Sequence, residues 1–213
     1  MLVGRRSVVL GLLATPSLLV ARSLSAGETV VPSIPLAFGV AQELLGEGDK
    51  AATVGVVTRD FIDAQLAQAN TIFGEHGVAF HEARDLVDLP QKTARLESAT
   101  DRDAMSEHMQ KQVVNIFFVA SLRDVDDKKV FRMGVTWRKL SDLSKKYIIV
   151  AASALPTTMA HELGHYLGND HSSVKNNLMS YDREPGAKVF LDDKQGEKAR
   201  KTALALFAKK TLA

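Results

Sequence analysis

Three histidines within eleven residues constrain this chain more than any other feature. The run from His161 to His171 reads His-Glu-Leu-Gly-His-Tyr-Leu-Gly-Asn-Asp-His. On a helix of about 3.6 residues per turn, His161 and His165 point the same way, one turn apart, as two ligands of one metal ion must. Glu162 lies about 100° around the helix from His161, so it flanks the metal and can take a proton from bound water. The stretch therefore predicts a metal-binding helix with a base beside it.

The rest of this stretch supports a helix that ends at a sharp turn. Apolar residues at helical spacing predict a buried face opposite the histidines, and they are Leu155, Met159, Leu163, Tyr166 and Leu167. Gly168 tolerates the left-handed conformation that ends a helix, and the turn can return His171 to the metal as a third ligand. Three histidines leave a fourth position for water, which distinguishes catalytic zinc sites from structural ones. The alternative is a solvated helix face with a glycine cap, but three of the six histidines fall at ligand spacing.

The pattern His-Glu-x-x-His-x-x-Gly-x-x-His resembles the metzincin zinc peptidases. Leu178-Met179-Ser180-Tyr181 resembles their methionine turn. Ser172-Ser173 after the third histidine is similar to the matrixin branch, and Met179-Ser180-Tyr181 is similar to the astacin and serralysin branches, so the subfamily stays open. The resemblance implies an α+β fold, a metzincin-like (zincin) domain with a twisted mixed sheet, an active-site helix and a C-terminal helix.

The predicted site follows from the motif and the resemblance together. We expect His161, His165 and His171 to bind one catalytic Zn²⁺, and Glu162 to act as the general base. By resemblance, Met179 packs below the site, and the Tyr181 hydroxyl reaches the zinc or the developing oxyanion. The alternative is that the Tyr181 side chain only packs against its neighbours and has no catalytic role.

Asp170 and a group of three aspartates earlier in the chain have two interpretations each. Asp170 is either a partner of a ligand histidine or a polar turn residue. A calcium site at Asp124, Asp126 and Asp127 is conceivable but has no supporting loop pattern, and a charged hairpin tip is the alternative.

An extended peptide or protein substrate is the partner that the resemblance implies. An edge strand presents unpaired backbone groups that can bind a peptide, and Met133 to Thr136 is where we place it. Trp137 either covers a substrate subsite or packs beside the sheet. Residues 182–186 either form the wall of a specificity pocket or simply connect two elements.

Periodicity and capping predict the other elements. Residues 27–35 are a linker or a first irregular strand, 36–45 are left unassigned, and 91–112 form a solvated charged helix with loop. The expected strands are 52–58, one beginning at 78–81, 113–120, 130–137 and 147–151. The expected helices are one capped by Asp60 and running to about Phe73, the metal-binding helix starting at Ser153 and Pro156, and one capped by Asp192 or Asp193 and running to about Lys210.

Residues 1–26 are typical of a signal peptide, and residues 27–213 then form a single metzincin-like catalytic domain. Arg5 and Arg6 precede a short apolar run and small residues, which predicts export to the periplasm or beyond. The twin arginine resembles a Tat signal, and an ordinary Sec signal is the alternative. Without this leader, 24 Lys and Arg stand against 25 Asp and Glu, so charge indicates neither nucleic-acid binding nor a stable membrane anchor. There is no cysteine, which excludes disulfides.

The leading hypothesis for function is a zinc-dependent endopeptidase. One alternative is a zinc-containing peptide- or protein-binding module with little activity, although Glu162 argues against a pure binder. Another is hydrolysis of a non-protein amide such as a cell-wall peptide, because the amide chemistry is shared. A Tat route would deliver a peptidase folded in the cytoplasm, which favours narrow selectivity or an inhibitor as a further partner.

Overall fold

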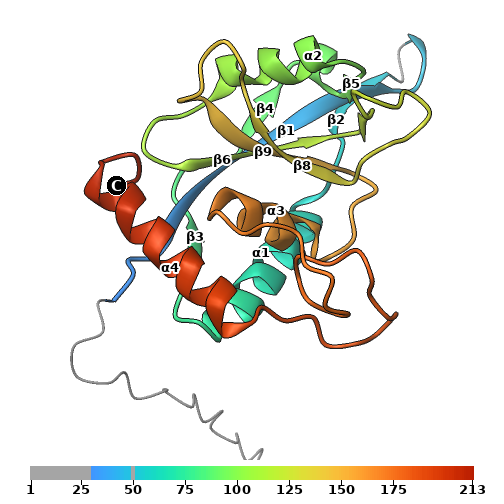
Figure 1. The fold of residues 1–213 in the computed structure, drawn as a ribbon. Coiled ribbons are helices and arrows are strands. Elements are labelled where there is room, and N and C mark those ends of the chain that lie inside the picture. Colours follow the sequence, from blue (N-terminus) through green and yellow to red (C-terminus); the bar gives the residue numbers. More distant parts are fainter. Residues whose placement is uncertain (1–29, 49–50) are drawn as a thin grey trace, which may run out of the picture.

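The computed structural model describes residues 30–48 and 51–213, and the predicted signal peptide lies outside them. Helices and a twisted mixed sheet combine in an α+β fold, as predicted (Figure 1). None of the described helices is long and apolar enough to cross a membrane.

One mixed sheet organises the fold. Its main path runs β2 (Ala52–Gly55), β1 (Ile34–Leu45), β6 (Val114–Val119), β9 (Lys146–Ala151) and β8 (Gly134–Arg138). β1, β6 and β9 are parallel, whereas β8 pairs antiparallel with β9 and forms the edge. Two short strands, β3 (Phe80–Glu82) and β4 (Val87–Leu89), also pair with β1, and β5 (Arg95–Leu96) pairs with β7 (Ser121–Leu122) in a second small sheet.

The first long strand is the largest difference from the sequence prediction. β1 begins at Ile34, inside the segment interpreted as a linker or irregular strand, and continues through the unassigned residues to Leu45. Its first eight residues are all buried. A strand buried on both faces has no polar alternation, so its apolar run cannot be told from a buried helix by periodicity.

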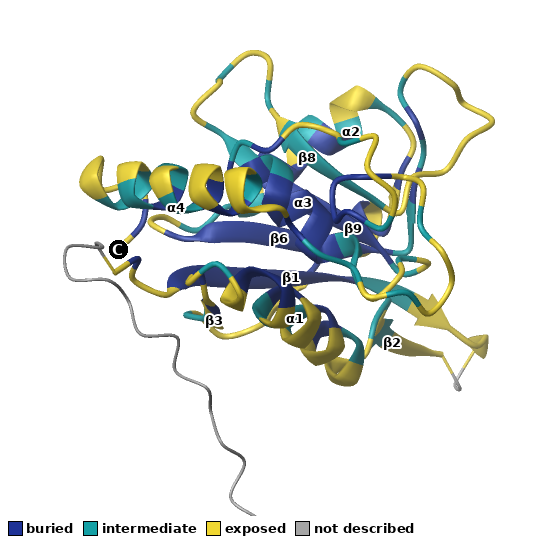
Figure 2. Ribbon diagram, turned by 60° about the horizontal axis from the view of Figure 1, so that its bottom comes forward, coloured by how far each residue is buried: buried dark blue, intermediate teal, exposed yellow. Residues whose placement is uncertain are grey.

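Three helices cover one face of the sheet. α1 (Arg59–Gly74), α3 (Thr158–Tyr166) and α4 (Asp193–Ala208) share one apolar core with β1, β6 and β9 (Figure 2). The opposite face packs on a smaller core near α2 (Ala99–Ala104). Helix α3 packs against β8, β9 and α1, so its residues lie next to the edge strand of the sheet.

Two of the three long helices begin at other residues than predicted. The N-cap of α1 is Thr58, whose hydroxyl accepts from Phe61 N–H, and Asp60 lies in the first turn. α3 begins at Thr158, two residues after Pro156, so Leu155 precedes the helix and is 56% exposed instead of buried. α4 has the predicted cap at Asp192, with Gln195 completing a capping box, and it ends at Ala208.

The charged stretch 91–112 is not the solvated helix that was predicted. It forms two 3-10 turns (Gln91–Thr93 and Met105–His108), β5 and the short α2. Arg102 stacks over the Trp137 ring, and Trp137 Nε1 donates to Asp103 Oδ1 at 2.7 Å. Trp137 therefore packs beside the sheet, which is the structural alternative to a substrate subsite.

The three aspartates at 124–127 form a turn. The Asp124 carboxylate accepts the backbone N–H groups of Asp126 and Asp127 at 2.8 Å and pairs with Arg132. These interactions hold its pKa at about 2. Since its oxygens face N–H donors and a cation, the hairpin-tip interpretation fits and calcium gains no support.

Replacing Gly164 with alanine should destabilise the fold. A Cβ at this position in α3 would overlap Met179 Sδ, and Met179 is fully buried. Overpacking of this kind costs about 1–3 kcal/mol. Urea unfolding of the wild type and Gly164→Ala measures the difference in the free energy of unfolding.

The matched control is Gly74→Ala, at the end of α1, where an added Cβ meets nothing within 4 Å. Because alanine favours helix over glycine by up to about 1 kcal/mol, this variant should be unchanged or more stable. Equal stabilities for the two variants would contradict the packing role of Met179.

Candidate metal centre

The three predicted ligands meet at one point. His161 and His165 project from the same side of α3, and Gly168, at φ 92°, ends the helix so that His171 returns beside them. His165 Nε2 lies 3.1 Å from the Nε2 atoms of both His161 and His171. Among the described residues these three form the one group of ligand side chains close enough to hold a metal ion.

Backbone carbonyls orient two of the rings. His161 Nδ1 lies 2.7 Å from Leu178 O, and His165 Nδ1 lies 2.9 Å from Asn169 O. A carbonyl only accepts, so each Nδ1 carries the proton and each Nε2 keeps a lone pair for a cation. Burial lowers the pKa of His161 to about 4 and also lowers that of His165, which favours neutral rings.

The spacing fits a small cation bound by imidazole nitrogen. Tetrahedral ligands at the 2.0–2.1 Å typical of zinc would lie about 3.3 Å apart, close to the two Nε2 separations. Neutral imidazole is a ligand that zinc accepts readily, as do several other transition metals. The geometry therefore supports a metal centre without fixing the identity of the metal.

Glu162 lies beside the ligands in a buried position. It is 6% exposed, and Thr136 Oγ1 from β8 lies 3.0 Å from Glu162 Oε2 and 2.7 Å from its backbone oxygen. Burial raises the pKa of the Glu162 carboxyl to about 7, and the Thr136 hydroxyl partly opposes this rise. Gly134 allows β8 to approach so closely, because a Cβ there would crowd Thr158 and Glu162.

The segment 178–181 lies against the histidine cluster. Met179 is buried beneath Gly164, which confirms its packing role. Tyr181 is 74% exposed, yet its hydroxyl lies 2.8 Å from His171 Nε2. The tyrosine oxygen therefore stands at the histidine cluster instead of packing in the core.

Arg183 is a site residue that the sequence did not reveal. Its Nε donates to Ser180 O at 2.9 Å and its Nη1 to Thr157 Oγ1 at 2.9 Å. Its Nη2 donates to Leu178 O, the carbonyl that also orients His161. One guanidinium thus ties the methionine turn to the N-cap of α3, and its place in the predicted loop 182–186 was the one available signal.

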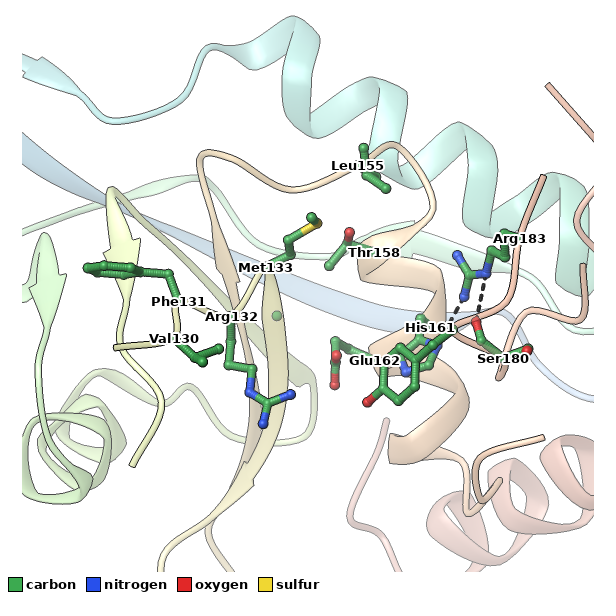
Figure 3. Close-up of a pocket in the computed structure, with 12 residues that line it drawn as sticks. Val130, Phe131, Arg132, Met133, Leu155, Thr158, His161, Glu162, Ser180 and Arg183 are labelled. Carbon is green, nitrogen blue, oxygen red and sulfur yellow. Dashed lines mark hydrogen bonds between the residues drawn. The ribbon is translucent and has the colours of Figure 1, made fainter. Parts of the chain in front are cut away.

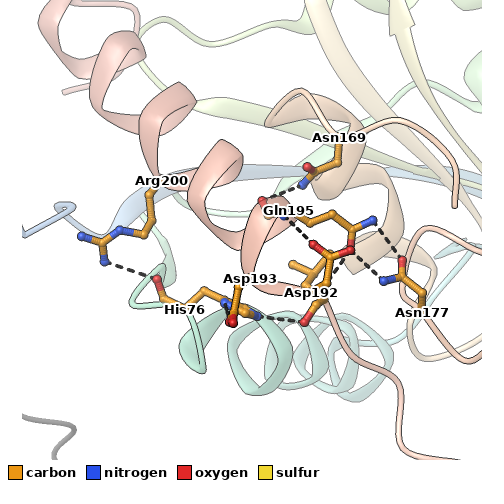
Figure 4. Close-up of polar contacts among 8 residues, drawn as sticks. His76, Asn169, Asn177, Asp192, Asp193, Gln195 and Arg200 are labelled. Atoms are coloured by element: carbon orange, nitrogen blue, oxygen red, sulfur yellow. Dashed lines mark hydrogen bonds and ion pairs between the residues drawn. The ribbon is translucent and has the colours of Figure 1, made fainter. Parts of the chain in front are cut away.

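A polar network connects α4 to the same turn (Figure 4). Asn177 is fully buried, donates to Gln195 Oε1 at 2.7 Å and accepts the Met179 N–H at 2.8 Å. Asn169, whose carbonyl orients His165, donates to Gln195 O at 3.3 Å. The capping box of the C-terminal helix therefore supports both the methionine turn and the turn after α3.

Asp170 does not join this network. Its side chain is 91% exposed and pairs with Lys198 at 3.0 Å. The polar turn residue is therefore the interpretation that the structure favours, and no role toward a ligand histidine is assigned to it.

A cleft opens beside His161 and Glu162. It has a volume of about 410 Å³, and His161, Glu162 and Arg183 line one side of it (Figure 3). Tyr181 also belongs to its lining. The segment 130–134, which leads into the edge strand β8, lines the other side. The predicted edge strand is thus present next to the site, beginning at Gly134.

Comparison with known proteins finds a similar fold but no matching sequence family. No protein-family model matches the sequence, and no curated protein sequence matches it. The structure is similar to the crystal structure of metalloproteinase-II from Bacteroides fragilis, with a TM-score of 0.53 and 15% sequence identity. The similarity covers 83% of this chain but 55% of that one, so this chain spans about half the length of that protein.

Proposed function

We propose that this protein is a zinc-dependent endopeptidase of the metzincin type. One observation carries the proposal: three histidine Nε2 atoms converge beside a buried glutamate, at a cleft bordered by an edge strand. The metalloproteinase with the similar fold is consistent with it. We further propose that residues 27–213 form one catalytic domain and that residues 1–26 direct its export.

In this mechanism His161, His165 and His171 would hold the zinc. When bound, zinc lowers the pKa of a coordinated water and polarises the scissile carbonyl. Glu162 accepts the proton of the attacking water and returns it to the leaving amine. Thr136 positions the Glu162 carboxylate, and the exposed edge of β8 pairs with the backbone of an extended peptide.

The proposal is tested by metal content and cleavage measured together on the full chain. We expect about one zinc per chain, and cleavage of an unfolded peptide mixture, read by mass spectrometry, that stops with a chelator and returns with zinc. One zinc without cleavage would favour a binding module or a non-protein amide substrate. No zinc after reconstitution would refute the metal centre itself.

Removing the Tyr181 hydroxyl should slow the reaction without releasing the metal. The hydroxyl lies 2.8 Å from His171 Nε2, where it can donate to the negative charge that develops on the scissile carbonyl oxygen. Loss of one such donor costs about 10²-fold or more in kcat. We expect Tyr181→Phe to show this loss with unchanged zinc content, and an unaltered kcat would leave Tyr181 without a catalytic role.

A further inference from the structure

Two arginines line the cleft from opposite sides. Arg132 lies just before β8, and Arg183 follows the methionine turn. Figure 3 shows Arg132 on the β8 side, extended toward the region of Glu162, and Arg183 beyond His161. Apart from these groups and the site residues, the lining is largely apolar and includes Val130, Met133 and Leu155.

The guanidinium of Arg132 makes an ion pair along one edge and is free to bind a ligand along the other. Its Nε pairs with the Asp124 carboxylate, which two backbone N–H groups also fix in the turn. A guanidinium has five N–H donors in a planar fork, so this contact leaves the two terminal nitrogens available. They make no hydrogen bond within residues 30–48 and 51–213, and the side chain is 49% exposed.

Arg183 brings a positive charge that no carboxylate in the described part of the chain pairs with. Its hydrogen bonds run to two backbone carbonyls and the Thr157 hydroxyl, and its Nη2 also lies 3.2 Å from His161 Nδ1. None of these partners carries a negative charge. Burial lowers its pKa, but a guanidinium remains charged at neutral pH. Glu162 is the one acidic residue among those that line the cleft, and the proposed mechanism uses it as the base.

We propose that the site selects substrates with a carboxylate next to the scissile amide, bound by the free edge of Arg132. Arg183 adds positive potential from the opposite wall, and the apolar lining accommodates the adjoining hydrocarbon. The inference rests on the proposed peptidase function and names its substrate class. An Asp or Glu side chain and the free C-terminal carboxylate of a short peptide offer the same chemistry, and the experiment separates them.

The test uses zinc-loaded full chain and matched peptides that differ at single positions around one cleavage site. Glu is compared with Gln and Lys at each position, and each peptide is made with a free or an amidated C-terminus. A charge-assisted contact predicts a preference of about 10- to 100-fold in kcat/KM for Glu over Gln at one position. Preference for Glu in both terminal forms identifies the side chain, whereas preference for the free terminus alone identifies the terminal carboxylate.

Substitutions of Arg132 test whether this residue causes the preference for a carboxylate. The Arg132→Gln variant should prefer Glu over Gln by about threefold or less in kcat/KM. The Arg132→Glu variant should instead prefer peptides with Lys at the same position. The matched control is Arg138→Gln, which removes the same charge from an exposed residue at the far end of β8, outside the cleft. The control should keep the wild-type preference.

A binding measurement separates failure of this inference from failure of the peptidase proposal. Zinc-loaded Glu162→Gln protein is titrated with the same fluorescent peptides, and the affinities are followed by anisotropy. Tighter binding of carboxylate peptides that is lost when Arg132→Gln is added supports the inference even without cleavage. Cleavage without a carboxylate preference, or equal binding of acidic and neutral peptides, would overturn it and leave the metal centre untouched.

Discussion

Glu162→Gln should lower kcat by about 10²- to 10⁴-fold while the protein keeps its metal. Glutamine matches the glutamate in shape and can still accept the Thr136 hydroxyl, so the geometry seen at 3.0 Å should persist. What it lacks is the ability to take a proton from the attacking water. Steady-state kinetics on one cleaved peptide, with zinc per chain measured on the same samples, gives both quantities.

Asp170→Asn provides the matched control for this carboxylate-to-amide change. Asp170 lies between His165 and His171 in sequence, but its side chain is exposed and pairs with Lys198. We expect kcat within about twofold of the wild type, since Asp170 pairs with Lys198 at the surface and does not line the cleft. A Glu162→Gln enzyme with nearly full activity would remove the general base from the mechanism and favour a different role for the cleft.

The part of the site that sequence could predict is the part built from neighbours in the chain. His161 and His165 converge because they are one helical turn apart, and His171 joins them because Gly168 takes a left-handed conformation. The position of Tyr181 could not be predicted from the geometry of the helix and its turn. Its place near His171 was expected from a family resemblance, because ten residues of irregular chain separate the two.

The contacts that sequence could not predict join distant segments. Thr136 reaches Glu162 across 26 positions, and Arg183 reaches Thr157 across the same separation. Which residue faces Glu162 depends on the register of β8 against β9 and on its distance from α3, and no local pattern encodes either. The residues that position the ligands and the base of such a site are therefore harder to infer from sequence than the ligands themselves.

Fold predictions failed where tertiary burial removed the usual periodic signals. β1 is buried on both faces along most of its length, so its sequence alternates in neither period. In the stretch 91–112, charged residues such as Arg102 are buried by stacking and hydrogen bonding. Alternating charges there suggested a solvated face, but the methylene stem and planar head of arginine allow it to pack inside.

His165→Ala should abolish the effect of zinc on thermal stability. In the wild type, zinc at 100 times its Kd should raise the free energy of unfolding by about 2.7 kcal/mol, because it binds the folded cluster. For a domain of this size that corresponds to roughly 5–11 °C in Tm. His165 is the ligand to remove, since its Nε2 lies 3.1 Å from both other Nε2 atoms and the pair left behind is an incomplete site.

His81→Ala is the matched control for this experiment. His81 is exposed on β3, bonded to Ser33 Oγ at 2.9 Å, and takes no part in the cluster. The control should keep the full zinc-dependent shift, and the His165→Ala protein should unfold at one temperature with or without zinc. Because the readout is thermal unfolding, it tests the metal centre independently of any substrate. A zinc shift that survives His165→Ala would place the metal elsewhere, and the three converging imidazoles would then need another explanation.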